Sequence, residues 1–174
     1  RSLDEARDLV AAWRTSGGHR RVDMVSLNSH IVRQETVRDM AVRKRLQVLV
    51  IEDEEFQRLA YEDIFAEWAL PIELKLAANG IDALLEIGRS CPDVLIVDLR
   101  MPEIDGFAVI RALREGRRYD EMDIVTITGL APQQIAAEGG LPDGVTVWQK
   151  PVPFDLLRGF LDARLAAFAR RKKR

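Results

Sequence analysis

The sequence is poor in cysteine and in long apolar runs, and both shortages exclude classes of protein. Cys91 is the one cysteine among 174 residues, so no disulfide can form within the chain. Nothing at its start resembles a secretory signal peptide and a lone thiol suits a reducing compartment, so we expect a cytoplasmic location. The longest aliphatic runs, Val48–Ile51 and Val94–Val97, are far shorter than the ~20 residues that span a bilayer, so we expect no membrane span.

Acidic residues are missing from one end of the chain and abundant in its middle. Residues 164–174 carry six basic side chains and no acidic one, whereas residues 46–163 carry 22 acidic and 10 basic side chains. Residues 1–45 are again basic, with ten basic against six acidic side chains, and the whole chain has a net charge of −2. An acidic body argues against nucleic acid as a partner and leaves room for a divalent cation.

From Gln47 onward, short aliphatic runs alternate with segments of helical periodicity, which predicts an α/β fold with a parallel sheet. The first helix is expected where Phe56, Leu59, Ile64 and Trp68 recur at helical spacing. Right-handed crossovers between five βα units then give a doubly wound sheet. The expected strands are 47–53, 72–77, 93–98, 123–128 and 145–150, and the expected helices are 54–69, 79–90, 106–116, 131–140 and 153–170.

Residues 1–45 do not continue this alternation. Two short helices are expected there, at about residues 3–13 and 29–44. Two short helices cannot bury a core alone, so they should pack on the α/β body, on a second copy as a dimer arm, or on another partner. The predicted organisation is a helical extension or linker over 1–45, an α/β domain over 46–170 and a basic tail over 171–174.

Polar side chains stand at the carboxyl ends of four expected strands. Glu52 and Asp53 end the first strand, Asp98 the third, Thr128 the fourth and Lys150 the fifth. Ligands of open α/β sheets bind beyond these ends, so we expect the five side chains to converge. Each has an ordinary explanation when taken singly, since a strand-terminal Asp often caps a helix and acids favour a helix N-terminus. A shared site explains them better together.

The carboxylates of this set are typical ligands of a hard cation. Three neighbouring carboxylates repel one another, and Mg²⁺ relieves that repulsion while keeping several of its waters. Asp53 and Asp98 are expected as direct ligands, and Glu52 as a ligand through water. The backbone carbonyl of Arg100 could supply another oxygen.

The same set of residues suits phosphoryl chemistry. A carboxylate can act as a nucleophile toward phosphorus, and Asp98 is the candidate. Mg²⁺ would neutralise the phosphoryl oxygens during transfer. The Lys150 ammonium and the Thr128 hydroxyl would then contact the phosphoryl group.

The chain resembles the receiver domain of two-component response regulators from Gln47 to about Phe168. The resemblance rests on VLVIEDE, DVLIVDLRMPEIDG, VTITG and WQKP, which stand in this order along the chain. It implies a flavodoxin-like, five-stranded sheet in the order 2-1-3-4-5. It also implies a cis bond before Pro151.

The resemblance further implies that Asp98 accepts a phosphoryl group from a histidine kinase or a histidine phosphotransfer protein. Thr128 and Lys150 would contact the phosphoryl oxygens. Mg²⁺ would be held by Asp53, Asp98 and the carbonyl of Arg100, with Glu52 beside them.

Three positions depart from the family pattern. Glu52 stands where Asp is commoner, a change that the family tolerates. Gly129 stands where Ala is usual, after Thr128. Val147 stands where the family often has Tyr or Phe, so the aromatic switch that such domains couple to the threonine is in doubt, while the phosphoacceptor chemistry is unaffected.

The expected function is a phosphorylation-dependent signalling switch that acts through an unidentified downstream protein and is not otherwise an enzyme. The alternatives left open are a receiver module of a larger hybrid histidine kinase, and an interaction scaffold that works largely without phosphorylation. A flavodoxin-like cofactor binder is disfavoured because the first loop, EDEEF, would repel a phosphate. A phosphatase with an Asp nucleophile is disfavoured because Arg100 stands where the best-known such family has its second Asp.

Overall fold

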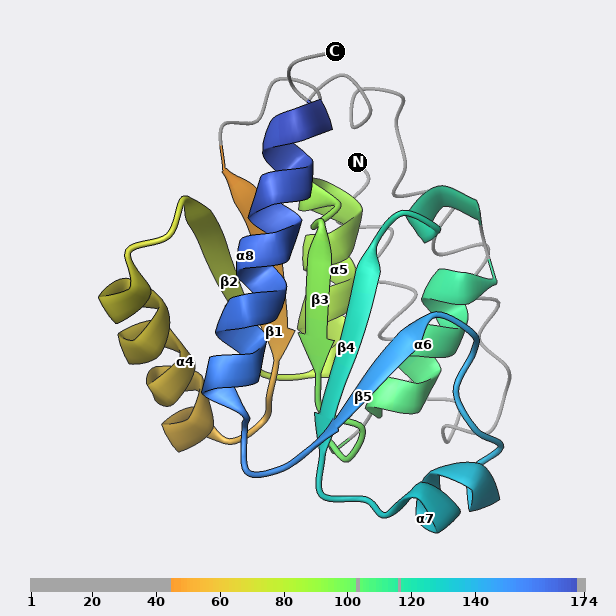
Figure 1. The fold of residues 1–174 in the computed structure, drawn as a ribbon. Coiled ribbons are helices and arrows are strands. Elements are labelled where there is room, and N and C mark those ends of the chain that lie inside the picture. Colours follow the sequence, from red (N-terminus) through yellow and green to blue (C-terminus); the bar gives the residue numbers. More distant parts are fainter. Residues whose placement is uncertain (1–44, 103, 116, 172–174) are drawn as a thin grey trace.

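The computed structural model describes residues 45–102, 104–115 and 117–171 of the chain (Figure 1). Its centre is a five-stranded sheet in the order β2-β1-β3-β4-β5, with every neighbouring pair parallel. The predicted α/β class and the 2-1-3-4-5 order are confirmed. In chain order the elements are β1 (Leu46–Ile51), α4 (Glu55–Trp68), β2 (Ile72–Ala77), α5 (Gly80–Ser90), β3 (Val94–Val97), α6 (Gly106–Arg114), the 3-10 helix η1 (Arg117–Tyr119), β4 (Asp123–Thr128), α7 (Pro132–Ala137), β5 (Val145–Gln149) and α8 (Phe154–Arg171).

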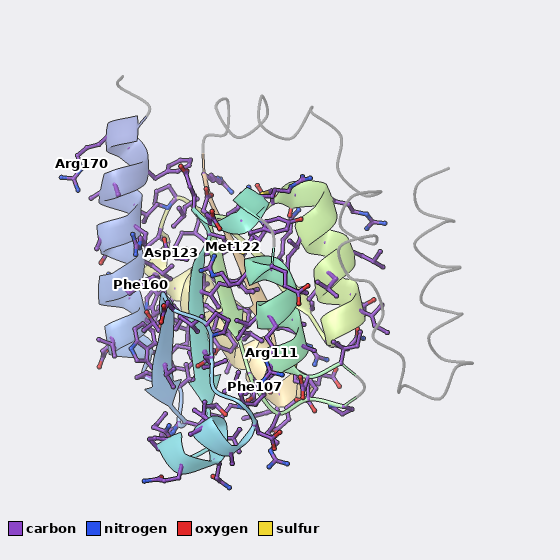
Figure 2. All side chains as sticks on the ribbon, turned by 90° about the vertical axis from the view of Figure 1, so that its right-hand side faces the viewer. Phe107, Arg111, Met122, Asp123, Phe160 and Arg170 are labelled. Carbon is purple, nitrogen blue, oxygen red and sulfur yellow. The ribbon has the colours of Figure 1, made fainter. Side chains whose placement is uncertain are left out.

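Helices cover both faces of the sheet. Helices α4 and α8 pack on one face, where Tyr61, Phe65, Leu157 and Leu161 are buried. Helices α5 and α6 pack on the other face, and the view in Figure 2 shows them across the sheet from α8. Since both faces are covered, every residue of β1 and β3 is buried, which explains why these two strands are almost continuously apolar.

Strand β2 lies at one edge of the sheet and is less buried than β1 or β3. Its sequence alternates apolar and polar residues, and the prediction of a strand near the edge is confirmed. Strand β5 forms the opposite edge.

Helix α4 buries only part of the stripe that its apolar spacing marks, and it also buries two aromatic residues beside that stripe. Tyr61 is 2% exposed and Phe65 is 9% exposed, whereas Phe56 is 83% exposed and Leu59 is 50% exposed. The Phe65 ring lies 4.9 Å from the Trp68 ring, centroid to centroid. The predicted helix is confirmed, but its apolar stripe is buried only toward its C-terminal end, where Trp68 packs on the core, while Phe56 and Leu59 stay exposed.

The remaining expectations for the ends of the chain fall largely outside the described residues. The helices predicted within residues 1–45 and the end of the basic tail belong to this group. Among the described helices, none is both long and apolar enough to cross a membrane. The peptide bond between Lys150 and Pro151 is cis, as the resemblance implied.

Candidate functional site

Three carboxylates meet beyond the carboxyl ends of β1 and β3, at the lower edge of the sheet in Figure 1. Ile51 and Val97 are paired in register, so Glu52 and Asp98 leave two neighbouring strands at the same level. Oxygens of Glu52, Asp53 and Asp98 all lie within 4.8 Å of one another. Glu52 is 2% exposed and Asp98 is 8% exposed, so two of the three carboxylates are almost removed from water.

Lys150 supplies the charge that compensates these acids. Its Nζ lies 2.7 Å from Asp98 Oδ2 and 3.0 Å from Glu52 Oε2, so one ammonium bridges the ends of β1 and β3. Burial alone would lower the pKa of Lys150, but its bonds to Asp98 and Glu52 outweigh that effect and hold the pKa above its ordinary value. Burial raises the pKa of Glu52, and the bond to Lys150 offsets only part of the rise.

Thr128 is fully buried at the end of β4. Its Oγ1 accepts a hydrogen bond from the backbone N–H of Leu130 (3.2 Å). Its carbonyl accepts one from the backbone N–H of Lys150 (2.9 Å), which ties the ends of β4 and β5 together. The side-chain amide of Gln149 donates to the carbonyl of Leu130 (2.9 Å), so β5 also holds the loop after Thr128.

The loop after Asp98 turns back against the strand end. The backbone N–H of Arg100 donates to Asp98 Oδ1 (3.0 Å), while the Arg100 side chain points to solvent. A Cβ on Gly106 would lie 2.3 Å from the carbonyl oxygen of Asp98, so only glycine allows this close approach. Asp105 caps α6 by accepting from the N–H of Ala108 (2.8 Å). The tight turn therefore fixes the backbone that presents the Asp98 carboxylate.

The structure brings together four of the predicted site residues, namely Glu52, Asp53, Asp98 and Lys150. Thr128 reaches the same edge through the backbone of Lys150.

Sequence reasoning missed two side chains that brace this edge. Arg58 returns from the first turn of α4 and donates through Nη1 to the carbonyls of Glu52 (2.8 Å) and Asp53 (2.6 Å). Gln149 holds the loop after Thr128 from β5. For Arg58 the available signal is a basic residue one turn into a helix that follows an acidic loop. Gln149 gives no comparable signal.

Besides Glu52, the two positions that depart from the family pattern are Val147 and Gly129, and the structure has room for a larger side chain at both. Val147 is 41% exposed on β5, where the family often places an aromatic ring. A Cβ built on Gly129 would meet nothing within 4 Å, so the alanine that is usual there would fit.

The comparisons with known proteins agree with this geometry. A family model described as the response regulator receiver domain matches residues 48–161. This chain belongs to the response regulator receiver family. The receiver is the signalling module of two-component systems, and the match contains the three carboxylates, Thr128 and Lys150.

The similar proteins include an enzyme and a chemotaxis protein. A protein-glutamate methylesterase/protein-glutamine glutaminase of Myxococcus xanthus is 32% identical over 90 residues, which cover 52% of this chain and 26% of that protein. The chain thus spans about a quarter of that relative's length. The chemotaxis protein CheY4 of Vibrio cholerae superposes with a TM-score of 0.55 at 27% identity, over 68% of this chain and 98% of that one.

A third similar structure is a receiver domain with a bound metal. The receiver domain of the sensor histidine kinase PA1611 of Pseudomonas aeruginosa superposes with a TM-score of 0.58 at 22% identity, over 68% of this chain and 96% of that one. That structure has a magnesium ion coordinated in its active-site cleft.

Proposed function

We propose that this receiver is a phosphorylation-dependent switch whose acceptor is Asp98. In the reaction an oxygen of the Asp98 carboxylate forms a bond to phosphorus, and the bond from phosphorus to a donor histidine breaks, with the electron pair leaving on the imidazole. Attack by water later returns the carboxylate and free phosphate. The observation that carries the proposal is the single Lys150 ammonium within 3.0 Å of both Asp98 and Glu52 at the end of the sheet.

The surroundings of Asp98 support this role. Asp98 is nearly buried and held at Oδ1 by the Arg100 N–H and at Oδ2 by Lys150, so its orientation is fixed before any donor arrives. Lys150 is positioned to balance the charge of a phosphoryl group on Asp98. The Thr128 hydroxyl, now accepting from Leu130, would turn to meet a phosphoryl oxygen.

The donor set also suits Mg²⁺. Three carboxylates with oxygens within 4.8 Å of one another form the hard oxygen cluster that this cation prefers. We propose that Asp53, Asp98 and the Arg100 carbonyl hold it directly and that Glu52 acts through water. When bound, the cation would offset the negative charge of the phosphoryl oxygens. The magnesium in the related kinase receiver is consistent with this assignment.

The test is the intact mass of the full chain after incubation with acetyl phosphate and Mg²⁺. We expect the wild type to gain the mass of one phosphoryl group and Asp98→Ala to gain none. Asp105→Asn is the matched control, because it changes a nearby loop acid but keeps a residue that can cap α6. Loss of labelling in EDTA would support the metal assignment. An unlabelled wild type, or equal labelling of Asp98→Ala, would refute the proposal.

A protein donor is favoured by exposed apolar side chains beside the site. Helices α4 and α8 both begin at the edge that carries Asp98, and Phe56, Leu59 and Leu156 are exposed within the first two turns of these helices. Contiguous apolar patches mark protein contact surfaces, and we propose that these side chains contribute to one. Phe56→Ala should label normally with acetyl phosphate but accept phosphate more slowly from a phosphorylated histidine phosphotransfer protein. Equal rates from both donors would remove this surface from the proposal.

The biological setting is part of the same proposal. We infer a bacterial, cytoplasmic receiver that acts on a downstream protein and whose own catalysis is limited to gaining and losing the phosphoryl group. The hybrid-kinase alternative is supported by the kinase receiver of similar structure, and the methylesterase relative likewise joins a receiver to further sequence. A scaffold role independent of phosphate would be favoured if Asp98→Ala kept full signalling activity.

A further inference from the structure

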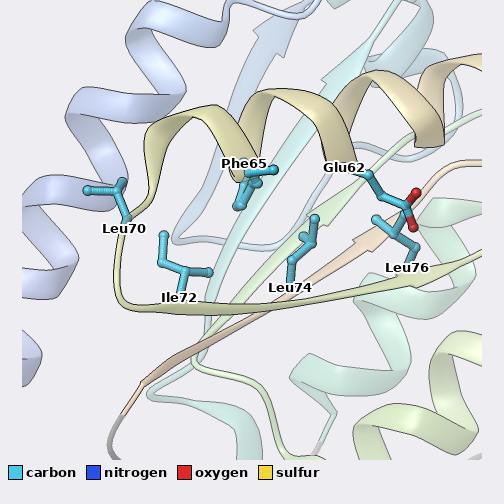
Figure 3. A pocket seen from close by; sticks show the side chains of 7 residues that line it. Glu62, Phe65, Leu70, Ile72, Leu74 and Leu76 are labelled. Carbon is cyan, nitrogen blue, oxygen red and sulfur yellow. The ribbon is translucent and has the colours of Figure 1, made fainter.

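A groove lined mostly by apolar side chains lies between α4 and β2, at the edge of the sheet. It has a volume of about 470 Å³, and Figure 3 shows α4 above it and the side chains of β2 rising toward the helix. Among the described residues, no strand pairs with this edge of β2. The residues lining it are Glu62, Phe65, Ala66, Leu70, Ile72, Leu74 and Leu76.

The backbone of this edge is ready to extend the sheet. The carbonyls of Pro71 and Ala77 accept from β1, through the N–H groups of Leu46 and Glu52. Successive residues of a strand direct their backbone groups to opposite sides, so the residues of even number face outward. The N–H of Ile72 donates to the carbonyl of Leu70. The other outward N–H and C=O groups of β2 have no backbone partner within the described part of the chain, and they form an open ladder of the kind that binds another strand.

We propose that a second copy of this chain pairs with this edge, β2 against β2 in antiparallel orientation, on a two-fold axis at Leu74. Since the outward backbone groups belong to even-numbered residues, hydrogen-bonded pairs must join even with even. In the register centred on Leu74, the N–H of Leu74 donates to the carbonyl of the partner's Leu74. The N–H of Leu76 donates to the carbonyl of the partner's Ile72.

Charge selects this register over its neighbours. With Leu74 on the axis, Glu73 stands opposite the partner's Lys75, and the symmetry repeats the pair. A shift of one step in either direction opposes Glu73 to the partner's Glu73, or Lys75 to the partner's Lys75, and like charges directly opposite are destabilising. The strand sequence IELKL is therefore complementary to itself in one register.

The proposed β2 pairing also extends the groove between α4 and β2. Leu74 and Ile72 lie on the α4 face, so the partner's Leu74 and the partner's Leu76 extend its apolar floor across the axis. On the opposite face Lys75 already pairs with Glu86 (2.6 Å), and Glu73 accepts from Gln47 Nε2 (2.5 Å). Both charged side chains therefore lie on the α5 face of β2, each with one contact inside its own chain, and the proposed pairing adds an opposite charge from the partner beside each of them.

Sedimentation velocity of the full chain over a range of concentrations tests the proposal. We expect a monomer–dimer equilibrium, with the dissociation constant raised about tenfold by Glu73→Lys or by Lys75→Glu, because each change places like charges opposite each other twice. The double variant should return to within about threefold of the wild type, since it restores two opposite-charge pairs. Leu74→Lys should abolish the dimer, and Val147→Lys, on the opposite edge strand, should leave it intact.

Each alternative occupant gives a different result. A chain that stays monomeric at every concentration overturns the proposal and leaves residues 1–44 or another protein as the occupant of the groove. A dimer that survives Leu74→Lys and both single charge reversals is formed elsewhere and also overturns it. Circular dichroism melts of the charge-reversed chains show whether these chains still fold. A variant that folds normally but no longer dimerises has lost the pairing alone. Phosphorylation of Asp98 is not required, so this result is independent of the proposed function.

Discussion

Replacing Lys150 by methionine should destabilise the fold to an extent that depends on pH. The change keeps the length of the side chain but leaves Asp98 and Glu52, 8% and 2% exposed, without their cation. Removing one partner of a fully buried pair costs about 3–5 kcal/mol. Because the Lys150 side chain is 21% exposed, water screens part of the effect, and we expect a loss of about 2–3 kcal/mol at pH 8.

The dependence on pH follows from Glu52. Its pKa is already raised by burial, and removing Lys150 takes away the main influence that lowers it. A carboxyl whose pKa is higher in the folded state than in the unfolded state favours folding when protonated, so stability falls as the pH rises from the unfolded value. Lys150→Met should therefore lose less stability relative to the wild type at pH 5, where Glu52 can take up a proton, than at pH 8.

Urea unfolding in EDTA, followed by circular dichroism at both pH values and at one protein concentration, measures this difference. The control is Arg164→Met, which breaks the ion pair with Asp123 at a more exposed site and should cost about 1 kcal/mol or less at either pH. An equal loss at pH 5 and pH 8, or a loss at pH 8 no larger than that of the control, would refute the reasoning.

Two further predictions concern backbone packing and alkaline pH. Gly106→Ala should lower the free energy of urea unfolding by about 3 kcal/mol or more, because its Cβ would lie 2.3 Å from the Asp98 carbonyl oxygen. The control is Gly159→Ala on α8, whose Cβ meets nothing within 4 Å and which should raise that free energy by about 0.5–1 kcal/mol. Burial raises the pKa of both tyrosines, Tyr61 and Tyr119. At a pH that half-ionises the urea-unfolded chain, absorbance at 295 nm should therefore show less tyrosinate in the folded chain. Stability should then fall above about pH 10, since the folded state holds more protons; normal ionisation of either tyrosine would contradict the burial.

The fold and the location of the site could be predicted because they depend on periodicity and topology. Aliphatic runs such as Val94–Val97 are buried on both faces, and parallel strands bring their carboxyl ends to one edge. Asp98 and Lys150 follow two such strand ends, so their convergence could be predicted from the sequence alone. The sheet order itself came from the resemblance and not from the pattern.

The contacts within the site could not be predicted in the same way. Lys150 bonds to Glu52 as well as to Asp98, and that choice depends on how far each side chain reaches beyond its strand end. Arg58 reaches back to two carbonyls because its side chain is long and flexible, a property that the sequence does not tie to a direction. Burial on α4 shows the same limit: spacing identifies an apolar stripe, but Phe56 and Leu59 on that stripe stay exposed while Tyr61 and Phe65 beside it are buried.

The two edges of the sheet are suited to different tasks. At the β5 edge, Lys150 is bonded to Asp98 through its side chain and to Thr128 through its backbone, so a phosphoryl group on Asp98 would act on β4 and β5 together. At the β2 edge, the proposed pairing uses Glu73 and Lys75, whose side chains bond to Gln47 and Glu86 and are separated from Lys150 by the fully buried β1 and β3. Buried strands packed on both faces resist small displacements, so a change at β5 should not reach β2. We therefore expect acetyl phosphate to leave the dissociation constant of the proposed dimer unchanged within about twofold, while a larger change would mean that the sheet transmits the signal from one edge to the other.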